Sequence, residues 1–308
     1  MELYQLRSFV AVAEVGHLTR AAERLHVSQP AVSAQIKALE DELDLALFER
    51  TSSGMVLTAA GSRLLADAQK VLIAAQALRN EAKALKGQVA GKVRVGTMTD
   101  PGVIRIGEFL NSTVERHPLL QVELHHEITG VAFDKVLSRE LDASFYYGDL
   151  EHPEVSRMRL RQTRYRLAAP AAWSERVDNA DWSDIALLPW IITPSISTHH
   201  KLMRTLFDKH GIEPVKVVEA DQESVISSLV VSGVGLSLIR EELALEKVAA
   251  GEVCLWKDVR LETTVWFIYL LERSDDPVIR ALLGVLRDIW KLPGLAAGPV
   301  VPEISLQG

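Results

Sequence analysis

Hydrophobic residues recur at helical spacing through the first 43 positions of the chain. Residues 3–13 carry leucine, phenylalanine or valine every three or four positions, which predicts an amphipathic helix. A second helix follows Thr19, which we expect to be its N-cap. A third follows the N-cap Ser28, with Pro30 tolerated in its first turn. Three short helices with a tight break at residues 26–28 are typical of a helix-turn-helix.

Two short apolar runs and a long helical pattern come next. The runs flank Thr51-Ser52-Ser53-Gly54 and predict a β-hairpin, the wing of the helix-turn-helix. Thr58 is expected to cap a long helix whose apolar positions alternate spacings of four and three. These positions are Leu64, Ala68, Val71, Ala75, Leu78, Ala82 and Leu85. Such a heptad seam predicts pairing with the same helix of a second copy, and the alternative is a helix lying on its own domain.

Beyond Gly87 and Gly91 the pattern changes to alternating strands and helices, which predicts a parallel doubly wound sheet. The first set begins with "KVRVGT" and ends with "LDASFYYG". A second set runs from "YRLAAP" to "GLSLI". The apolar strand "TTVWFIYLLE" comes so late that we expect it to return to the first sheet. The tail from Pro293 has no periodicity and is expected to be loose.

Charge is distributed unevenly along the 308 residues. The whole chain has a net charge of -7, but residues 1–86 contain ten basic and ten acidic side chains and are neutral. The acidic excess therefore belongs to residues 87–308. Because phosphate binding depends on where the cations lie, the acidic total does not exclude nucleic acid as a partner of the N-terminal part.

Composition indicates a globular protein of a reducing compartment. Cys254 is the only cysteine, so neither an intrachain disulfide nor a cysteine zinc cluster can form. No apolar run approaches the ~20 residues that span a bilayer. The N-terminus "MELYQLRSFV" lacks the pattern of a signal peptide, and we expect a cytoplasmic protein.

Long segments of the chain resemble the LysR-type transcriptional regulators. The resemblance rests on "LRSFVAVAEVGHLTRAAERLHVSQPAVSAQIKALEDEL" and "LFERTSSGMVLTAAG", and more weakly on "GIEPVKVVEADQESVISSLVVSGVGLSLI". It covers the whole chain. It implies a fold with an N-terminal winged helix-turn-helix, a long linker helix, and a two-lobed α/β effector domain like the periplasmic binding proteins. Three positions depart from the family's pattern, with Ala34, Asp44 and Ser53 where Arg, Gly and a basic residue are favoured. These changes concern the affinity for DNA and the operator sequence, and they leave the fold unaffected.

The resemblance and the patterns together predict the domain boundaries. Residues 1–58 form the winged helix-turn-helix and residues 59–89 the linker helix for dimerisation. Residues 90–293 form the effector-binding domain, and residues 294–308 form a flexible tail. Within the effector-binding domain, the first lobe takes about residues 90–162 plus 269–293, and the second lobe takes about residues 163–268.

The predicted function is sequence-specific binding of double-stranded DNA at a dyad-symmetric operator, modulated by a small-molecule effector. The N-terminal residues of a recognition helix read base edges in the major groove, while basic and hydroxyl side chains contact phosphate. The predicted contacts are Thr19, Arg20, Gln29, Pro30, Ser33, Gln35, Lys37, Arg50, Thr51, Ser52 and Ser53. For Arg24 and Arg50, an ion pair with Glu23, Glu40 or Glu49 is an open alternative.

The effector is expected between the two lobes, where strands end and helices begin. The predicted set is Thr97, Met98, Thr99, Asp100, Ile128, Thr129, Tyr146, Tyr147, Thr193, Ser195, Ser197, His199, Ala220 and Asp221. Thr129 and Asp221 have the alternative role of helix caps. Carboxylates near the expected site make a dianion a less suitable ligand than one with a cationic end, such as an amino acid.

The resemblance further implies a homodimer through the linker helix and a homotetramer, with RNA polymerase as another partner. No cofactor and no metal site are predicted. An enzyme on the same α/β framework is the competing class. However, G-x-S-x-G, G-x-G-x-x-G after a strand, a P-loop lysine and H-E-x-x-H are all absent from the sequence. A DNA-binding protein whose sensor no longer binds a ligand is the third possibility.

Overall fold

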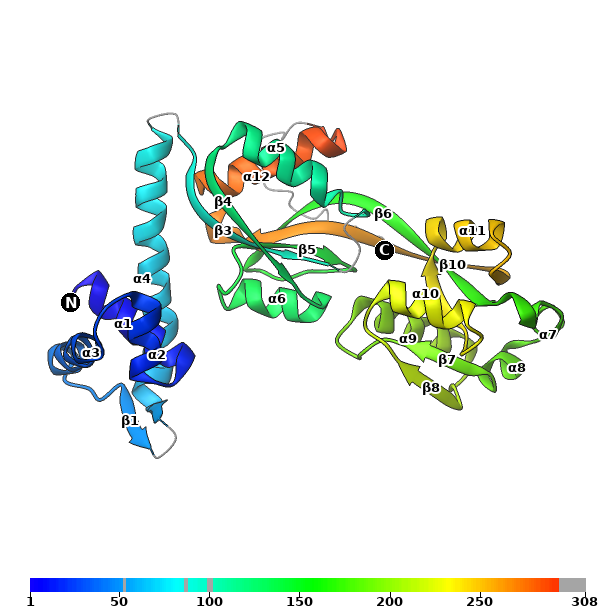
Figure 1. Cartoon of the computed structure of the whole chain (residues 1–308), viewed down its shortest axis with the longest axis horizontal. Helices are drawn as coiled ribbons and strands as arrows, with labels where there is room; N and C mark the ends of the chain where they lie inside the picture. Colours follow the sequence, from blue (N-terminus) through cyan, green and yellow to red (C-terminus); the bar gives the residue numbers. More distant parts are fainter. Residues whose placement is uncertain (52–53, 86–87, 99–101, 294–308) are drawn as a thin grey trace, which may run out of the picture. The chain divides into compact units, whose positions relative to one another are not determined.

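The computed structural model describes residues 1–51, 54–85, 88–98 and 102–293, so the predicted tail lies outside the described residues. The chain divides into two compact units, Met1–Gly87 and Gln88–Gly308, which we call the N-terminal and C-terminal units. Figure 1 shows both in sequence colours. Within the described ranges, no helix combines the length and hydrophobicity required to span a bilayer.

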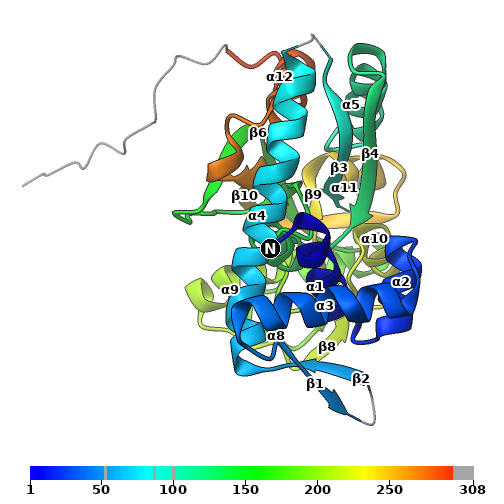
Figure 2. The same ribbon diagram turned by 90° about the vertical axis from the view of Figure 1, so that its left-hand side faces the viewer.

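The N-terminal unit consists of helices and a two-stranded wing. Its elements are α1 (Leu3–Val15), α2 (Leu18–Leu25), α3 (Gln29–Leu43), β1 (Phe48–Thr51), β2 (Gly54–Leu57) and α4 (Ala59–Ala84). Figure 2 shows α3 and the wing of this unit from another side. Phe9, Val12, Leu39 and Leu47 are almost fully buried at its centre, and the Phe9 ring packs edge-on against Phe48. This core explains the apolar spacing in the sequence.

The predicted caps are confirmed at two helices and wrong at one. The Ser28 hydroxyl accepts a hydrogen bond from the Ala31 backbone N–H at 3.3 Å, and Thr58 accepts one from Gly61 at 2.9 Å. In contrast, α2 begins one residue before Thr19, and its N-cap is His17, which makes no side-chain capping bond. Thr19 therefore lies in the first turn of α2, with its side chain exposed.

The wing requires a glycine where it meets the end of α1. Strands β1 and β2 pair in antiparallel fashion from Phe48 opposite Leu57 to Thr51 opposite Gly54. Gly54 has a φ of 133°, and a Cβ there would lie 2.3 Å from the Gly16 carbonyl oxygen. That carbonyl also accepts a hydrogen bond from the Met55 N–H at 2.7 Å. The close approach fixes the wing against the helices.

The predicted seam of α4 changes its surroundings along its length. Leu64 and Ala68 pack into the core of the N-terminal unit, as the alternative interpretation proposed. Farther along, Val71, Leu78 and Leu85 are 40%, 72% and 81% exposed. The first part of the seam is therefore used within the unit, and the remainder presents apolar side chains to solvent.

The C-terminal unit has two lobes. The first lobe contains β3 (Ala90–Thr97), α5 (Ile106–Arg116), β4 (Leu119–His126), α6 (Thr129–Leu137), β5 (Ala143–Tyr147), η2 (Leu271–Arg273) and α12 (Pro277–Trp290). The second contains η1 (Ala171–Trp173), α7 (Ser174–Asp178), α8 (Trp182–Ala186), β7 (Pro189–Ile192), α9 (Thr198–His210), β8 (Lys216–Glu219), α10 (Glu223–Val231), β9 (Ser237–Arg240) and α11 (Glu241–Ala249). Two long strands belong to both lobes, β6 (Val155–Pro170) and β10 (Val253–Leu270).

The main sheet is mixed, and the prediction of a parallel sheet was wrong in this respect. Its strand order is β4-β3-β5-β10-β6-β9, with β3 parallel to β4 and β5. Strand β10 runs antiparallel to β5 and β6, and β9 runs antiparallel to β6. The expected return of the late strand is confirmed, because Val265–Tyr269 pair with Ala143–Tyr147. The antiparallel pairs arise because the chain passes between the lobes on two neighbouring strands (Figure 1).

Each lobe has its own aromatic core. In the first, Phe145 packs against Phe109 and Phe267 with ring centroids 5.8 Å and 5.2 Å apart. In the second, Trp190 packs edge-on against Phe207 at 4.8 Å. Burying one such ring stabilises the fold by about 1.5–3 kcal/mol. Two separate cores joined by two strands give lobes that are each compact on their own.

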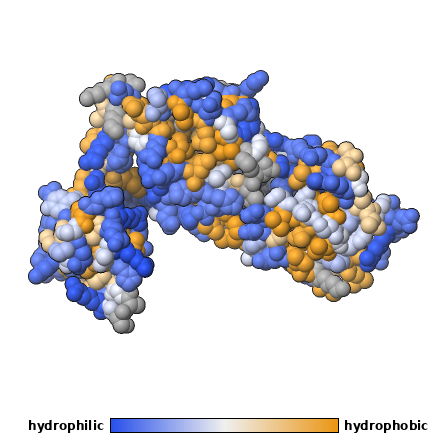
Figure 3. All heavy atoms as spheres, in the orientation of Figure 1, coloured by the Kyte–Doolittle hydropathy of each residue, from blue (hydrophilic) through white to orange (hydrophobic). Residues whose placement is uncertain are grey.

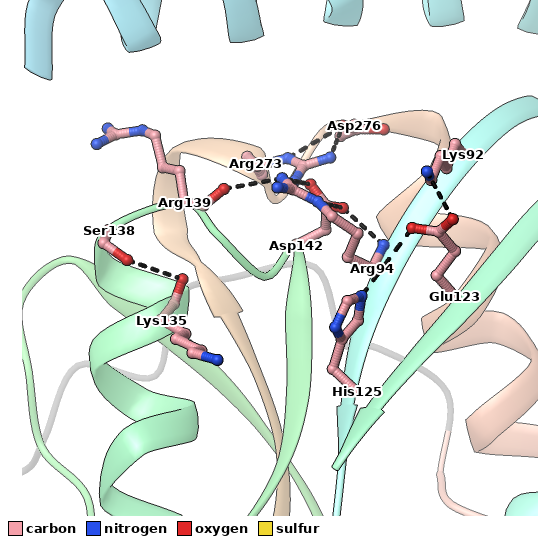
Figure 4. A network of polar contacts seen from close by, with 10 residues as sticks. All are labelled: Lys92, Arg94, Glu123, His125, Lys135, Ser138, Arg139, Asp142, Arg273 and Asp276. Atoms are coloured by element: carbon pink, nitrogen blue, oxygen red, sulfur yellow. Dashed lines mark hydrogen bonds and ion pairs between the residues drawn. The ribbon is translucent and has the colours of Figure 1, made fainter. Parts of the chain in front are cut away.

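A buried carboxylate fastens three segments of the first lobe (Figure 4). Asp142, just before β5, accepts hydrogen bonds from the Arg94 backbone and guanidinium and from Arg273 at 2.6–3.2 Å. Arg273 also donates to Asp276, which caps α12 through the Val278 N–H at 2.8 Å. The network ties the start of β5, strand β3 and the beginning of α12 together.

Candidate functional site

The exposed face at the N-terminus of α3 is the first candidate site. Gln29, Pro30 and Lys37 are exposed, and Ser33 is half-buried at its edge. Lys37 has no ion-pair partner among the residues that the structure describes. A short hydroxyl, an amide and a free ammonium on one helix face can contact both base edges and phosphate.

Gln35 does not belong to this exposed face, and its predicted orientation was wrong. Its side-chain oxygen accepts a hydrogen bond from the hydroxyl of Ser8, which is 1% exposed on α1. The contact joins α1 to α3 and uses the oxygen that an adenine contact would require. Helical spacing alone could not reveal this, because Gln35 lies at the border between the buried and the exposed face.

The remaining predicted contacts lie on α2 and the wing. Thr19, Arg20 and Arg50 are exposed, and Thr51 closes the wing through a 3.2 Å hydrogen bond to Gly54. Ser52 and Ser53 lie outside the described residues. Arg24 does form an ion pair, with Glu14 at 2.6 Å and not with the three glutamates considered for it. Of these, Glu40 instead accepts hydrogen bonds from the Leu47 and Phe48 N–H groups.

A cavity between the lobes is the second candidate site. The first lobe supplies five of its lining residues, the second lobe seven, and strand β6 supplies Tyr165. The lining residues are Met98, Glu127, Ile128, Thr129, Tyr147, Tyr165, Thr193, Ser197, Thr198, His199, Asp221, Glu223 and Ile226. The helices α6, α9 and α10 all begin at this cavity. Their N-terminal N–H groups carry partial positive charge, which favours a negatively charged ligand group.

Eight of the predicted effector-binding residues line the cavity, and four described ones do not. Tyr146 turns into the core beside Leu141, Ala220 packs beside Ile191, Ser195 is exposed, and Thr97 remains within strand β3. Thr99 and Asp100 lie outside the described residues. Sequence reasoning missed Glu127, Tyr165, Thr198, Glu223 and Ile226. Alternation along β5 could have separated Tyr146 from Tyr147, because neighbouring strand residues point to opposite faces.

A chain of hydrogen bonds fixes the wall of the cavity around His199. The His199 Nε2 atom lies 2.8 Å from the Leu238 carbonyl oxygen, so Nε2 carries the proton and Nδ1 accepts. Thr193 lies 3.4 Å from Nδ1 and also contacts the hydroxyl of Ser197, the N-cap of α9. Withdrawal from water lowers the pKa of His199 to about 4. The imidazole is therefore neutral at physiological pH.

The lobes touch each other beside the cavity. The Thr198 hydroxyl of α9 donates a 2.6 Å hydrogen bond to the Tyr147 carbonyl at the end of β5. At Gly130, a Cβ would lie 2.3 Å from Ile196 Cγ1 and 2.7 Å from its carbonyl oxygen. Only a residue without a side chain allows this approach of α6 to the second lobe.

Two carboxylates of the cavity wall have cationic partners. Glu127 forms an ion pair with Lys135, and Glu223 accepts hydrogen bonds from the Arg240 N–H at 3.0 Å and from its Nε at 2.7 Å. The alternative interpretation of Thr129 and Asp221 as helix caps was wrong. The N-cap of α6 is Ile128 and that of α10 is Gln222. Among the described residues, no group of three or more His, Cys, Asp or Glu side chains could hold a metal ion.

Comparison with family models covers both units. Residues 3–62 match the bacterial regulatory helix-turn-helix proteins of the lysR family, and residues 86–291 match the LysR substrate binding domain. The chain is 28% identical over 239 residues to the HTH-type transcriptional regulator YofA of Bacillus velezensis, covering 78% of this chain and 81% of that protein. It is 30% identical over 254 residues to the HTH-type transcriptional regulator BenM of Acinetobacter baylyi, covering 78% and 80%.

Solved structures show the same architecture. A full-length cysteine-to-aspartate variant of OxyR from Pseudomonas aeruginosa is similar with a TM-score of 0.68 and 27% identity, and the match covers 95% of each chain. Full-length CbnR in complex with its target DNA is similar with a TM-score of 0.59 and 25% identity, covering 94% of this chain and 99% of that one. The order of a helix-turn-helix followed by a mixed α/β substrate-binding domain is shared with both.

Proposed function

The chain belongs to the LysR family of bacterial regulatory proteins, and from this membership we propose which of its residues act on DNA and effector. It is a DNA-binding transcriptional regulator with an effector-binding domain. The observation that carries the proposal is the exposed N-terminal face of α3, with Gln29 and Pro30 preceding Ser33 and the unpaired Lys37. Helix α3 enters the major groove with this face.

The other contacts position the winged helix-turn-helix of residues 1–58, which we call the head, on the duplex. Arg20 and Thr19, in the first turn of α2, lie close to the phosphate backbone, and Arg50 with the Thr51–Ser53 wing approaches the adjacent backbone or minor groove. Gln35 contributes by holding α3 against α1. Because the N-terminal unit has no net charge, its affinity for non-specific DNA is modest and its binding depends on base contacts.

Two copies pair through α4 and present two heads to a dyad-symmetric operator. The exposed Val71, Leu78 and Leu85 support this pairing. Two dimers form a tetramer through the C-terminal units. Hydrophobic residues gather around β4, α5 and α12 in Figure 3, and Val114 and Leu119 there are 59% and 55% exposed. Apolar area of this kind is typical of surfaces that bind another protein.

The effector occupies the cavity between the lobes and changes the arrangement of the heads through the C-terminal unit. The protein acts in the cytoplasm, where its DNA target lies, and RNA polymerase is a further partner. The walls of the cavity bind and orient a ligand, and no reaction is assigned to them. The relatives are named as transcriptional regulators, which supports a role without catalysis.

Footprinting on the DNA upstream of the protein's own gene tests the function. We expect Gln29→Ala to lower affinity for the protected site by about ten- to a hundredfold, because it removes one bidentate base contact. The matched variant Gln69→Ala on α4 should keep the footprint. Metabolite binding, measured by thermal shift, should be equal in both variants. Equal loss of DNA and metabolite binding in Gln29→Ala would contradict the assignment of the two units.

A further inference from the structure

The ionisable side chains that line the interlobe cavity are carboxylates, with no cation among its described lining residues. Glu127, Asp221 and Glu223 line the cavity, and among its described lining residues His199 is the only other ionisable group apart from the tyrosines. Burial keeps the His199 ring neutral, and the Leu238 carbonyl holds its proton on Nε2. Residues 99–101 are outside the described part, and their types, Thr, Asp and Pro, add no basic side chain. Among the described lining residues, a ligand therefore meets three carboxylates and no side-chain cation.

Asp221 is the carboxylate that remains available to a ligand. The charge of Glu127 is matched by Lys135 and that of Glu223 by Arg240. Asp221 has neither an ion-pair nor a hydrogen-bond partner among the described residues, and it does not cap α10. A free carboxylate in a cavity wall attracts an ammonium group, since a charge-assisted hydrogen bond to it is about twice as strong as a neutral one.

On the opposite lobe, the hydroxyl of a cavity-lining residue also lacks a partner. Thr129 is 6% exposed and lines the cavity, yet its hydroxyl makes no hydrogen bond to the residues that the structure describes. It stands in the first turn of α6, whose N-cap Ile128 provides no side-chain acceptor. A nearly buried donor beside the N–H groups of a nine-residue helix suits a carboxylate of the ligand.

The wall of the cavity also includes apolar side chains from both lobes. Met98 and Ile128 come from the first lobe, and Ile226, which is 1% exposed, comes from α10. An aliphatic or thioether group in contact with them would be removed from water, which stabilises the complex.

We propose that the effector is a small zwitterion of the α-amino-acid type with an apolar side chain. Its ammonium group binds Asp221, and its carboxylate binds the Thr129 hydroxyl and the N-terminus of α6. This inference rests on the proposed function, because it names the ligand class of the same cavity. Since Thr129 and Asp221 belong to different lobes, one ligand that contacts both holds the lobes together.

Calorimetry on the full-length protein tests the proposal with matched probes. The probes are L-leucine, L-methionine, L-valine and L-phenylalanine, each with the acid that lacks its amine and the amine that lacks its carboxylate, together with succinate. We expect at least one amino acid to bind, and each of its two charge-deleted analogues to bind at least about tenfold more weakly.

Two isosteric variants assign the ends of the ligand. Asp221→Asn should lower the affinity for the amino acid by about tenfold or more. The variant should then bind the amino acid no more tightly than the acid that lacks an amine. Thr129→Val should lower the affinity both for the amino acid and for the acid that lacks an amine. Glu246→Gln, an exposed carboxylate on α11 outside the cavity, is the matched control and should bind like the unaltered protein. An Asp221→Asn variant with unchanged preference for the amino acid would overturn the assignment.

Other outcomes refute the ligand class itself. Tighter binding of succinate, or of the acid without an amine, would overturn the proposal, and so would failure of all four amino acids to bind. A footprint from the same preparation distinguishes the causes. If the footprint persists, only the ligand class has failed. If the DNA is not protected either, the proposed function has failed as well.

Discussion

At the scale of the residue, the Asp142 carboxylate accepts hydrogen bonds from two guanidinium groups of the first lobe, those of Arg94 and Arg273. Burial alone would raise the pKa of Asp142, but the hydrogen bonds from Arg94 and the charges of Arg273 and Arg94 outweigh it and lower the pKa. We expect Asp142→Asn to reduce the free energy of unfolding by about 2–4 kcal/mol, since Arg94 would lose its anion and Arg273 would lose one of its two. Urea denaturation at pH 7 measures the difference.

The pH dependence of this loss has a defined sign. Because the folded pKa of Asp142 lies below its ordinary value of 3.8, its contribution is complete above about pH 4 and disappears as the pH falls through the folded pKa. The control is Asp288→Asn, an exposed partner of Arg116, which should cost less than about 1 kcal/mol. Equal losses in the two variants would refute the role of Asp142.

His199 should remain a neutral imidazole with its proton on Nε2. Its pKa falls from 6.5 to about 4, so the unfolded chain binds a proton first as the pH decreases. Stability is therefore lost between pH 6.5 and about 4. Nitrogen-15 NMR should show the Nε2–H tautomer, unchanged down to about pH 5, in the protein and in Thr193→Val, because the Leu238 carbonyl fixes it. A ring protonated at about pH 6 would contradict this geometry.

At the scale of elements, the start of α6 depends on one glycine. We expect Gly130→Ala to destabilise the C-terminal unit by about 1–3 kcal/mol, because the new Cβ would meet the Ile196 backbone oxygen. The matched control is Gly107→Ala within α5, where the added Cβ meets no atom within 4 Å. That variant should be neutral or more stable by up to about 1 kcal/mol. Chemical denaturation measures the free energy of unfolding of both variants. Equal values for the two would contradict the close contact between Gly130 and Ile196.

The elements themselves were predictable where their hydrophobic pattern was complete. The three helices of the head and the return of the late strand follow from it. Strand β6 was expected to begin at Tyr165, ten residues late, although Met158 and Leu160 alternate there with arginines. Helix α11 was not predicted. The mixed direction of the sheet could not be predicted, because it depends on which segments become neighbours, and the sequence does not show that β10 lies between β5 and β6.

At the scale of the whole molecule, the proposed function requires two heads on one operator. We expect Leu78→Glu to convert the proposed dimer to monomers, because Leu78 is 72% exposed on the seam and a charge there would be buried on pairing. Affinity for a dyad operator should then fall by about a hundredfold or more through loss of the second head. Light scattering after gel filtration measures the mass. Ala66→Glu, exposed on the opposite face of α4, is the control and should remain dimeric.

The sequence by itself determined the family, the order of the units, the helix-turn-helix, and the caps Ser28 of α3 and Thr58 of α4. These features depend on residues close together in the chain, whose spacing is visible directly. Only the tertiary structure decided that Gln35 faces Ser8, that Tyr146 is buried while Tyr147 lines the cavity, and that Glu127 and Glu223 join its wall. The physical reason is that a cavity wall is assembled from elements far apart in sequence. Whether a polar side chain there is paired or free depends on partners brought in from another element.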